Sequence, residues 1–155
     1  MDRIPMTPQG YEMLKNELAH IKSVERPRNI QAIEEARAHG DLSENAEFDA
    51  AKDRQGFIEA KIHELSYKLG HADIIDPRNL PKDKAVFGTK VVLENVETGD
   101  VFEYQLVGPD ESNIEQGRIS VSSPLGKSLL GRKPGEEVQL NAPGGERRYE
   151  IIEIL

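Results

Sequence analysis

A long apolar repeat in residues 48–72 constrains the fold more than any other feature of this sequence. Eight positions follow one another in alternating steps of three and four residues, with a glutamine as the one polar member: Phe48, Ala51, Gln55, Ile58, Ile62, Leu65, Leu69 and Ala72. This spacing is typical of a helix that packs against another helix along a narrow seam. The repeat therefore requires a partner helix.

The preceding residues predict that partner. Thr7 and Pro8 form a helix start, with a capping hydroxyl followed by a proline in the first turn. The apolar stripe that follows consists of Tyr11, Leu14, Leu18 and Ile21, and after Pro27 it continues through Ile30, Ile33 and Ala36. Proline inside a helix removes a hydrogen bond, which predicts a kink near residues 25–28.

The two helical stretches are separated only by a short turn that begins at Gly40, a residue suited to ending a helix. Two helices joined so closely pack antiparallel, as a hairpin. At 1.5 Å per residue, each arm has a length on the order of 45 Å. Because the hairpin satisfies its own seam, a monomer is expected.

Prolines near residues 77–82 end the helical pattern, and short β-rich runs replace it. We predict an α+β protein: a coiled-coil hairpin (1–76), a linker (77–82) and a small antiparallel-sheet domain (83–155). The expected strands lie at 91–96, 101–108, 118–121, 136–140 and 148–154, with one short helix in 122–131.

Composition excludes several function classes. The net charge of −8 argues against nonspecific binding to nucleic acid. The absence of cysteine excludes disulfides and thiolate chemistry, and no apolar stretch approaches the length of a signal peptide or membrane span, so we expect a cytoplasmic protein. No histidine follows His71, which excludes a serine triad confined to the second domain.

Two acids, Asp41 and Glu44, lie at the bend of the hairpin. One interpretation is a capping box, in which Asp41 caps the second arm and Glu44 reaches back; Ser43 is an alternative cap. The other is a shared Mg²⁺, because side chains three residues apart on a helix lie roughly 5–6 Å from each other. Two carboxylates hold Mg²⁺ weakly, so a partner would have to complete such a site.

The bend and its surroundings resemble a known family. The stretch HGDLSENAEFDAAKDRQGFIEAKI is similar to the tip of the Gre-type bacterial transcript-cleavage factors, and the likeness extends to IPMTPQGYEMLKNEL, VFGTKVVLEN and SVSSPLGKSLLG. The resemblance implies a second domain similar to the FK506-binding-protein fold, which docks on bacterial RNA polymerase. It also implies that the coiled coil enters the secondary channel of the polymerase.

The resemblance implies that Asp41 and Glu44 help to hold the second Mg²⁺ of the polymerase. The polymerase then cleaves the 3′ end of backtracked RNA. The chain would be an accessory factor and not an enzyme by itself. The resemblance also places Arg37 and Lys52 in a patch that contacts the RNA; the alternative is a solvated helical face. Residues 122–131 are candidates for docking.

Three other functions stay open on the sequence alone. The chain could be a polymerase-binding module that occupies the channel without promoting cleavage, with the acids serving only as caps. It could be a prolyl isomerase, although the second domain offers few aromatic side chains for such a pocket: Phe87, Phe102, Tyr104 and Tyr149. An autonomous nuclease would need a third metal ligand that the bend lacks.

Overall fold

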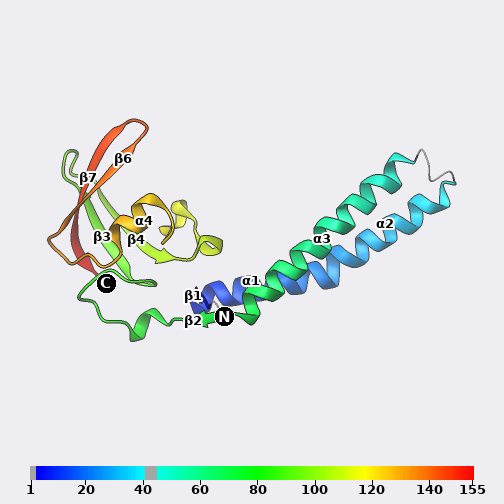
Figure 1. Ribbon diagram of the computed structural model, residues 1–155, viewed down its shortest axis with the longest axis horizontal. Coiled ribbons are helices and arrows are strands. Elements are labelled where there is room, and N and C mark those ends of the chain that lie inside the picture. Colours follow the sequence, from blue (N-terminus) through cyan, green and yellow to red (C-terminus); the bar gives the residue numbers. More distant parts are fainter. Residues whose placement is uncertain (1–2, 41–44) are drawn as a thin grey trace. The chain divides into compact units, whose positions relative to one another are not determined.

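A computed structural model describes residues 3–40 and 45–155, which belong to two compact units (Figure 1). The first unit is built mainly from Tyr11–Ala72, and the second contains Asp73–Leu155 together with Pro5–Gly10. From the sequence, the first domain was predicted to end at residue 76. The inclusion of Pro5–Gly10 in the second unit has no counterpart in that prediction.

The first unit is a helical hairpin. Its first arm consists of α1 (Pro8–His20), the π-helical turn η1 (Ile21–Glu25) and α2 (Arg26–Ala38), and its second arm is the 25-residue helix α3 (Ala46–Gly70) (Figure 1). Every member of the stripe predicted on residues 48–72 is buried or half-buried, including Leu65, which is 1% exposed. The apolar repeat therefore predicted the seam of the second arm correctly.

The stripe of the first arm changes phase at the π-helical turn. Leu14 and Ile21 are buried and seven residues apart, but the next buried position is Asn29, eight residues after Ile21. A π-helical turn takes up one more residue than an α-helical turn, so the residues that follow are shifted by one position. The prediction that Ile30 belongs to the seam is therefore wrong, and Ile30 is 45% exposed.

The kink predicted near residues 25–28 stays a prediction; the structure shows a π-helical turn shortly before Pro27. The backbone N–H of Arg26 donates to the carbonyl of Ile21, and Pro27 lies in the first turn of α2. Glu25 and Arg26 have helical backbone angles, so Pro27 lies within a continuous helical stretch and removes one backbone hydrogen bond from it.

Two short strands, β1 (Ile4–Met6) and β2 (Ala72–Ile74), form a two-stranded sheet where the chain passes from one unit to the other. The N–H of Ile4 donates to the carbonyl of His71, and the N–H of Ile75 donates to the carbonyl of Met6, each at 2.8 Å. These strands were not predicted, because three residues are too few to show an alternating pattern.

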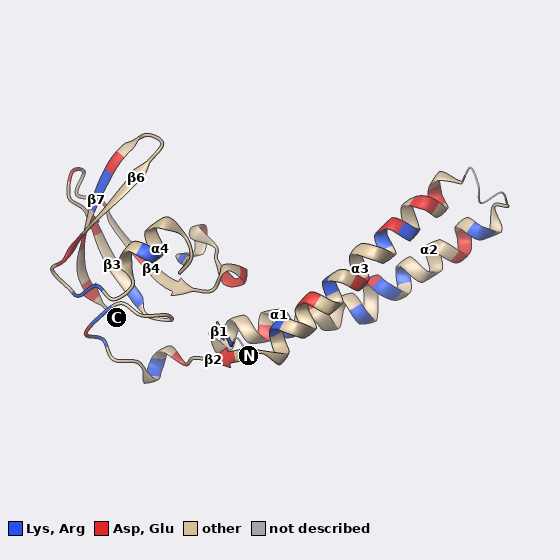
Figure 2. Ribbon diagram, in the orientation of Figure 1, with Lys and Arg blue, Asp and Glu red and all other residues tan. Residues whose placement is uncertain are grey.

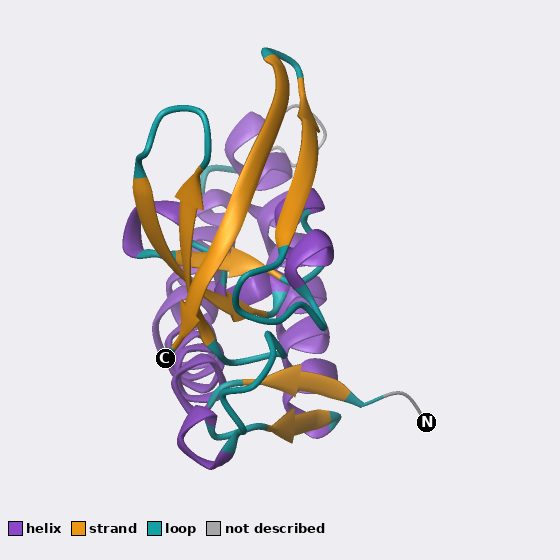
Figure 3. Ribbon diagram, turned by 90° about the vertical axis from the view of Figure 1, so that its left-hand side faces the viewer, coloured by secondary structure: helices purple, strands orange, loops and turns teal. Residues whose placement is uncertain are grey.

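The second unit is a five-stranded sheet with the strand order β5-β4-β3-β7-β6, curled into one layer (orange in Figure 3). The bounds are β3 (Lys90–Asn95), β4 (Val101–Val107), β5 (Arg118–Ser120), β6 (Glu137–Ala142) and β7 (Gly145–Ile154). All five predicted strands are present. The β4–β5 pair is parallel, so the sheet is mixed, and the predicted antiparallel sheet is corrected in this one pair.

The core of the second unit lies between the sheet and the short helix α4 (Pro124–Leu129). Six side chains in it have no measurable exposure: Ala85, Val91, Leu93, Leu106, Leu129 and Ile151. The helix starts as the Ser-Pro sequence predicts, because the Ser123 hydroxyl accepts from the N–H of Gly126 at 3.1 Å and donates to the carbonyl of Ser120 at 2.6 Å.

Pro5–Gly10 is held in the second unit by a buried carboxylate. Glu111, which is 4% exposed, accepts hydrogen bonds from the hydroxyl and the N–H of Thr7 and from the N–H of Gly108. The Thr7 hydroxyl in turn accepts from the N–H of Gly10 at 3.0 Å, which confirms the predicted helix cap. The carboxylate therefore fastens the residues from which α1 begins.

Candidate functional site

The bend between the two arms is formed by the end of α2 and the start of α3. Gly40 has φ of +103°, which favours glycine, and this explains why the first arm stops there. On the other side, Asn45 is the N-cap of α3, and its Oδ1 accepts from the N–H of Phe48 at 3.1 Å. The cap of the second arm is therefore Asn45, and the prediction that Asp41 or Ser43 caps this helix is wrong.

Asp41 and Glu44 lie outside the described residues. The helix bounds leave both acids in the segment between α2 and α3, since α2 ends at Ala38 and α3 begins at Ala46. Their role as metal ligands stays a prediction.

The described residues around the bend bring the two arms together through three side-chain contacts. The guanidinium of Arg37 lies 5.9 Å from the centre of the Phe48 ring, a cation–π contact. His39 Nδ1 lies 3.2 Å from a carboxylate oxygen of Glu47. The Asn45 side-chain amide donates to the carbonyl of Ala36 at 2.6 Å.

The two residues predicted to contact RNA lie on different arms. Arg37 is in the last turn of α2, and Lys52 is on α3, where its ammonium group donates to Gln55 at 3.0 Å. Both side chains belong to exposed residues, so they are accessible to a ligand. Contact with RNA stays a prediction for both.

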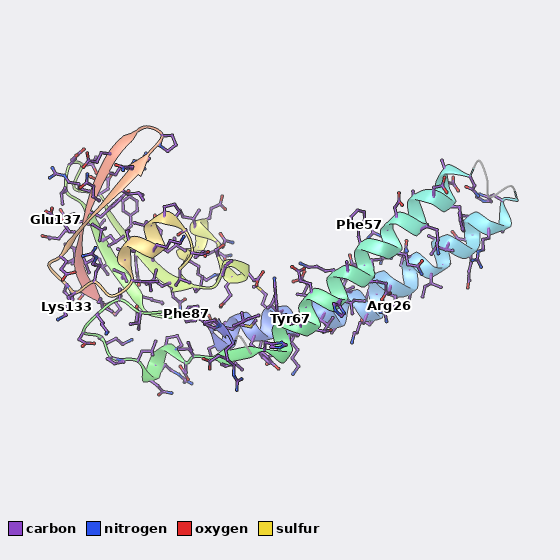
Figure 4. The ribbon with its side chains drawn as sticks, in the orientation of Figure 1. Arg26, Phe57, Tyr67, Phe87, Lys133 and Glu137 are labelled. Atoms are coloured by element: carbon purple, nitrogen blue, oxygen red, sulfur yellow. The ribbon has the colours of Figure 1, made fainter. Side chains whose placement is uncertain are left out.

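Other basic residues of the hairpin are engaged in pairs between the arms. Arg26, labelled in Figure 4, makes two hydrogen bonds to the carboxylate of Glu59, at 2.8 and 2.9 Å. Arg54 lies 3.8 Å from Glu25. Acidic and basic residues are interspersed along both arms (Figure 2). This arrangement fits a solvated helical face, so Arg26 and Arg54 are poorer candidates for RNA contact than Arg37 and Lys52.

The described residues do not form a metal site of their own. Within residues 3–40 and 45–155, no group of three or more His, Asp or Glu side chains is placed to hold a metal ion. At the bend, Oδ1 of Asn45 already accepts the capping hydrogen bond and Glu47 already faces His39. A Mg²⁺ ion at the bend would therefore depend on Asp41, Glu44 and ligands from a partner.

The second unit contains an apolar cleft of about 610 Å³ between the sheet and α4. The Phe102 ring contacts two tyrosine rings of the cleft: it lies 5.8 Å from the ring of Tyr104 and 6.3 Å from that of Tyr149. Pro124 and Leu125 of α4 form the opposite wall. Burial in the cleft raises the pKa of the Tyr104 hydroxyl, and the neighbouring Tyr149 raises it further.

The charges at the cleft have one sign. Arg118 and Arg147 line it, and none of its lining residues is acidic, although the chain as a whole carries a net charge of −8. This cleft was not predicted from the sequence. A usable signal was the pair Phe102 and Tyr104, because residues two apart on a strand lie on the same face.

The chain thus consists of a helical hairpin followed by a small mixed-sheet domain. Residues 4–74 match the family model described as transcription elongation factor, N-terminal, and residues 80–155 match the one described as transcription elongation factor, GreA/GreB, C-term. The chain belongs to the GreA/GreB family of transcription elongation factors.

Several relatives are similar over nearly their whole length. The transcription elongation factor GreA of Neisseria meningitidis serogroup A is 54% identical over 155 residues, which covers 99% of this chain and 98% of that protein. The GreA of Thermodesulfovibrio yellowstonii is 52% identical, with coverage of 99% and 97%. The crystal structure of GreA factor homolog 1 of Thermus thermophilus aligns with a TM-score of 0.46 at 28% identity, covering 99% of each chain.

None of the helices in the described residues is long and apolar enough to cross a membrane.

Proposed function

We propose that this elongation factor acts on bacterial RNA polymerase by inserting its hairpin into the secondary channel and stimulating cleavage of backtracked RNA. The observation that carries the proposal is the hairpin itself. Its two arms bury a single narrow seam, and its bend has the acids Asp41 and Glu44 in its sequence. A thin rod that places acids at one end can deliver them to a site that a globular surface cannot enter.

In this mechanism the chain supplies ligands and the polymerase supplies the rest of the reaction centre. Asp41 and Glu44 would hold a Mg²⁺ ion together with ligands of the polymerase and RNA phosphate, as Mg²⁺ is commonly bound. The ion would lower the pKa of a bound water for attack on phosphorus. Arg37 and Lys52 would place positive charge next to the RNA. The chain alone would not be a nuclease.

We assign docking on the polymerase to the apolar cleft of the second unit. Its apolar walls and its two arginines fit a polymerase segment with an apolar side chain flanked by acidic residues. Part of the wall, Ser123 to Leu125, lies within the segment 122–131 that the sequence indicated as a docking candidate. Arg147→Glu should therefore raise the factor concentration that gives half-maximal cleavage, with little change in the maximal rate.

The decisive experiment measures RNA cleavage in halted, backtracked polymerase complexes with Mg²⁺. Asp41→Asn and Glu44→Gln remove a charge with little change in shape, and both should lose most of the stimulation while still binding polymerase. Glu34→Gln makes the same chemical change at an exposed position on α2 and is the matched control.

Two outcomes would contradict the proposal. Full stimulation by Asp41→Asn would exclude the metal role and would favour a factor that merely occupies the channel. RNA cleavage by the purified chain with Mg²⁺ and without polymerase would show that it is a nuclease in its own right.

A further inference from the structure

Two asparagine side chains cross the seam of the hairpin and donate to backbone carbonyls of the opposite arm. Asn29, on α2, donates through Nδ2 to the carbonyl of Ala51 on α3 at 3.0 Å. Asn45, at the start of the second arm, donates through Nδ2 to the carbonyl of Ala36 on α2 at 2.6 Å. The two hydrogen bonds therefore run in opposite directions between the arms.

Both bonds belong to one alignment of the arms. From Asn29 to Ala36 the first arm advances seven residues, and from Ala51 back to Asn45 the second arm returns six. A slip of one helical turn would move one arm by about 5.4 Å along the other and would break both bonds. It would also leave the Asn29 amide, which is 4% exposed, without its acceptor inside the seam.

The apolar side chains of the seam do not fix this alignment as strictly. On α3, Ile58, Ile62 and Leu65 repeat at heptad spacing, and apolar packing is not directional, so a slipped arm meets similar surfaces. Ala36 and Ala51 contribute little side-chain volume. A buried asparagine in an apolar seam is a known way for a coiled coil to select one register at a cost in stability.

Asn45 has a second task at the bend. Its Oδ1 caps α3 through the N–H of Phe48 while its Nδ2 holds the end of α2, so one side chain joins both arms where the chain reverses. We infer that Asn29 and Asn45 are positioning residues that fix the register of the hairpin, and with it the place along the rod at which the segment containing Asp41 and Glu44 is held. The functional half of this inference rests on the function proposed above.

The register can be measured directly because the chain has no cysteine. Spin labels on Glu34→Cys and His63→Cys report it, since both residues are exposed, lie on different arms and are far apart along the axis. Because the labels are separated mainly along the helix axis, a slip of one turn changes the distance between them by nearly the rise of that turn, about 5 Å.

The test compares the labelled parent with the same protein carrying Asn29→Leu and Asn45→Ser. Leucine keeps the approximate size of asparagine without the donor, and serine keeps a helix cap but is too short to reach Ala36. The parent should give one narrow distance distribution, whereas the double variant should give a second population displaced by about 5 Å, with helicity by circular dichroism retained. Gln31→Leu, the corresponding amide-to-leucine change at an exposed site on α2, is the control and should keep one distance.

The polymerase assay provides a second, separate readout. The maximal cleavage rate of the double variant should fall by the fraction of molecules found in the slipped register, with no change in the concentration needed for half-maximal effect. A single, unshifted distance in the folded double variant would overturn the inference, whatever its cleavage rate. If the parent itself does not stimulate cleavage, the proposed function fails while the distance measurement still decides the register.

Discussion

Replacing Gly10 with alanine should destabilise the second unit, although alanine is the better helix former. Gly10 lies in the first turn of α1, and an added Cβ would overlap the carboxyl group of Glu111 and lie 2.5 Å from its Cγ, where ordinary van der Waals contact is 3.4–4 Å. Glu111 can move aside only by giving up its bonds from Thr7 and Gly108.

The magnitude follows from two opposing terms. A hydrogen bond to a charged group contributes about 1.5–3 kcal/mol. The two 3.4 Å bonds to Glu111 are longer than ordinary hydrogen bonds and add little, so the bond from the Thr7 hydroxyl dominates and losing the set costs about 3 kcal/mol. Alanine in place of glycine in a helix recovers about 1 kcal/mol. We therefore expect Gly10→Ala to lower the free energy of unfolding by about 2 kcal/mol.

The assay is urea unfolding followed by circular dichroism, with hydrogen exchange to assign the change to the residues around Thr7. Gly56→Ala is the matched control, because Gly56 also lies in a helix but a Cβ there meets nothing within 4 Å. That substitution should stabilise the hairpin by about 1 kcal/mol.

A double-mutant cycle makes the test sharper. Once Glu111→Ala has removed the side chain that Cβ would strike, Gly10→Ala should become neutral or stabilising. The reasoning is refuted if Gly10→Ala raises the stability of the second unit in the otherwise unchanged protein, or if its effect is the same with and without the Glu111 side chain.

Three further predictions concern other parts of the chain. Hydrogen bonds from the Arg78 side chain and backbone N–H lower the pKa of Asp76 to about 2. The stability that these bonds contribute is therefore fully present above the ordinary pKa of 3.8 and is lost as the pH falls towards 2. In Arg78→Gln, an NMR titration should show the pKa of Asp76 return towards 3.8. Ser123→Ala should destabilise the second unit by about 1 kcal/mol in urea unfolding, since it removes the cap on Gly126. Leu65→Ala should cost the hairpin about 2–5 kcal/mol, seen as a lower midpoint of its helical transition, because Leu65 is fully packed in the seam.

The sequence was sufficient to predict the features that depend on the spacing of residues close together in the chain. The stripe of α3, the five strands and the Ser-Pro start of α4 each follow from residues close together in the chain. The residues of the first arm that face the seam after Ile21 could not be predicted in this way. The π-helical turn shifts the buried positions by one residue, and the hydropathy pattern gives no sign of such a turn.

Long-range contacts account for the remaining differences. The parallel pairing of β5 with β4 and the docking of Thr7 on Glu111 join residues far apart in sequence, and no single stretch carries a signal for them. At the bend, Asn45 took the capping role predicted for Asp41 or Ser43. The choice among these neighbouring capping residues depends on where the second arm meets Ala36, which only the packed hairpin determines.

The place of β7 in the sheet has a consequence for biosynthesis. This strand pairs with β3 on one side and β6 on the other, so the sheet lacks an inner member until residues 145–154 have left the ribosome. The hairpin, in contrast, has all of its seam by residue 72 and can fold while translation continues. Pro5–Gly10, although made before the hairpin, must wait for Glu111 to emerge before it can dock, so this segment finds its native neighbours only after the hairpin has been completed.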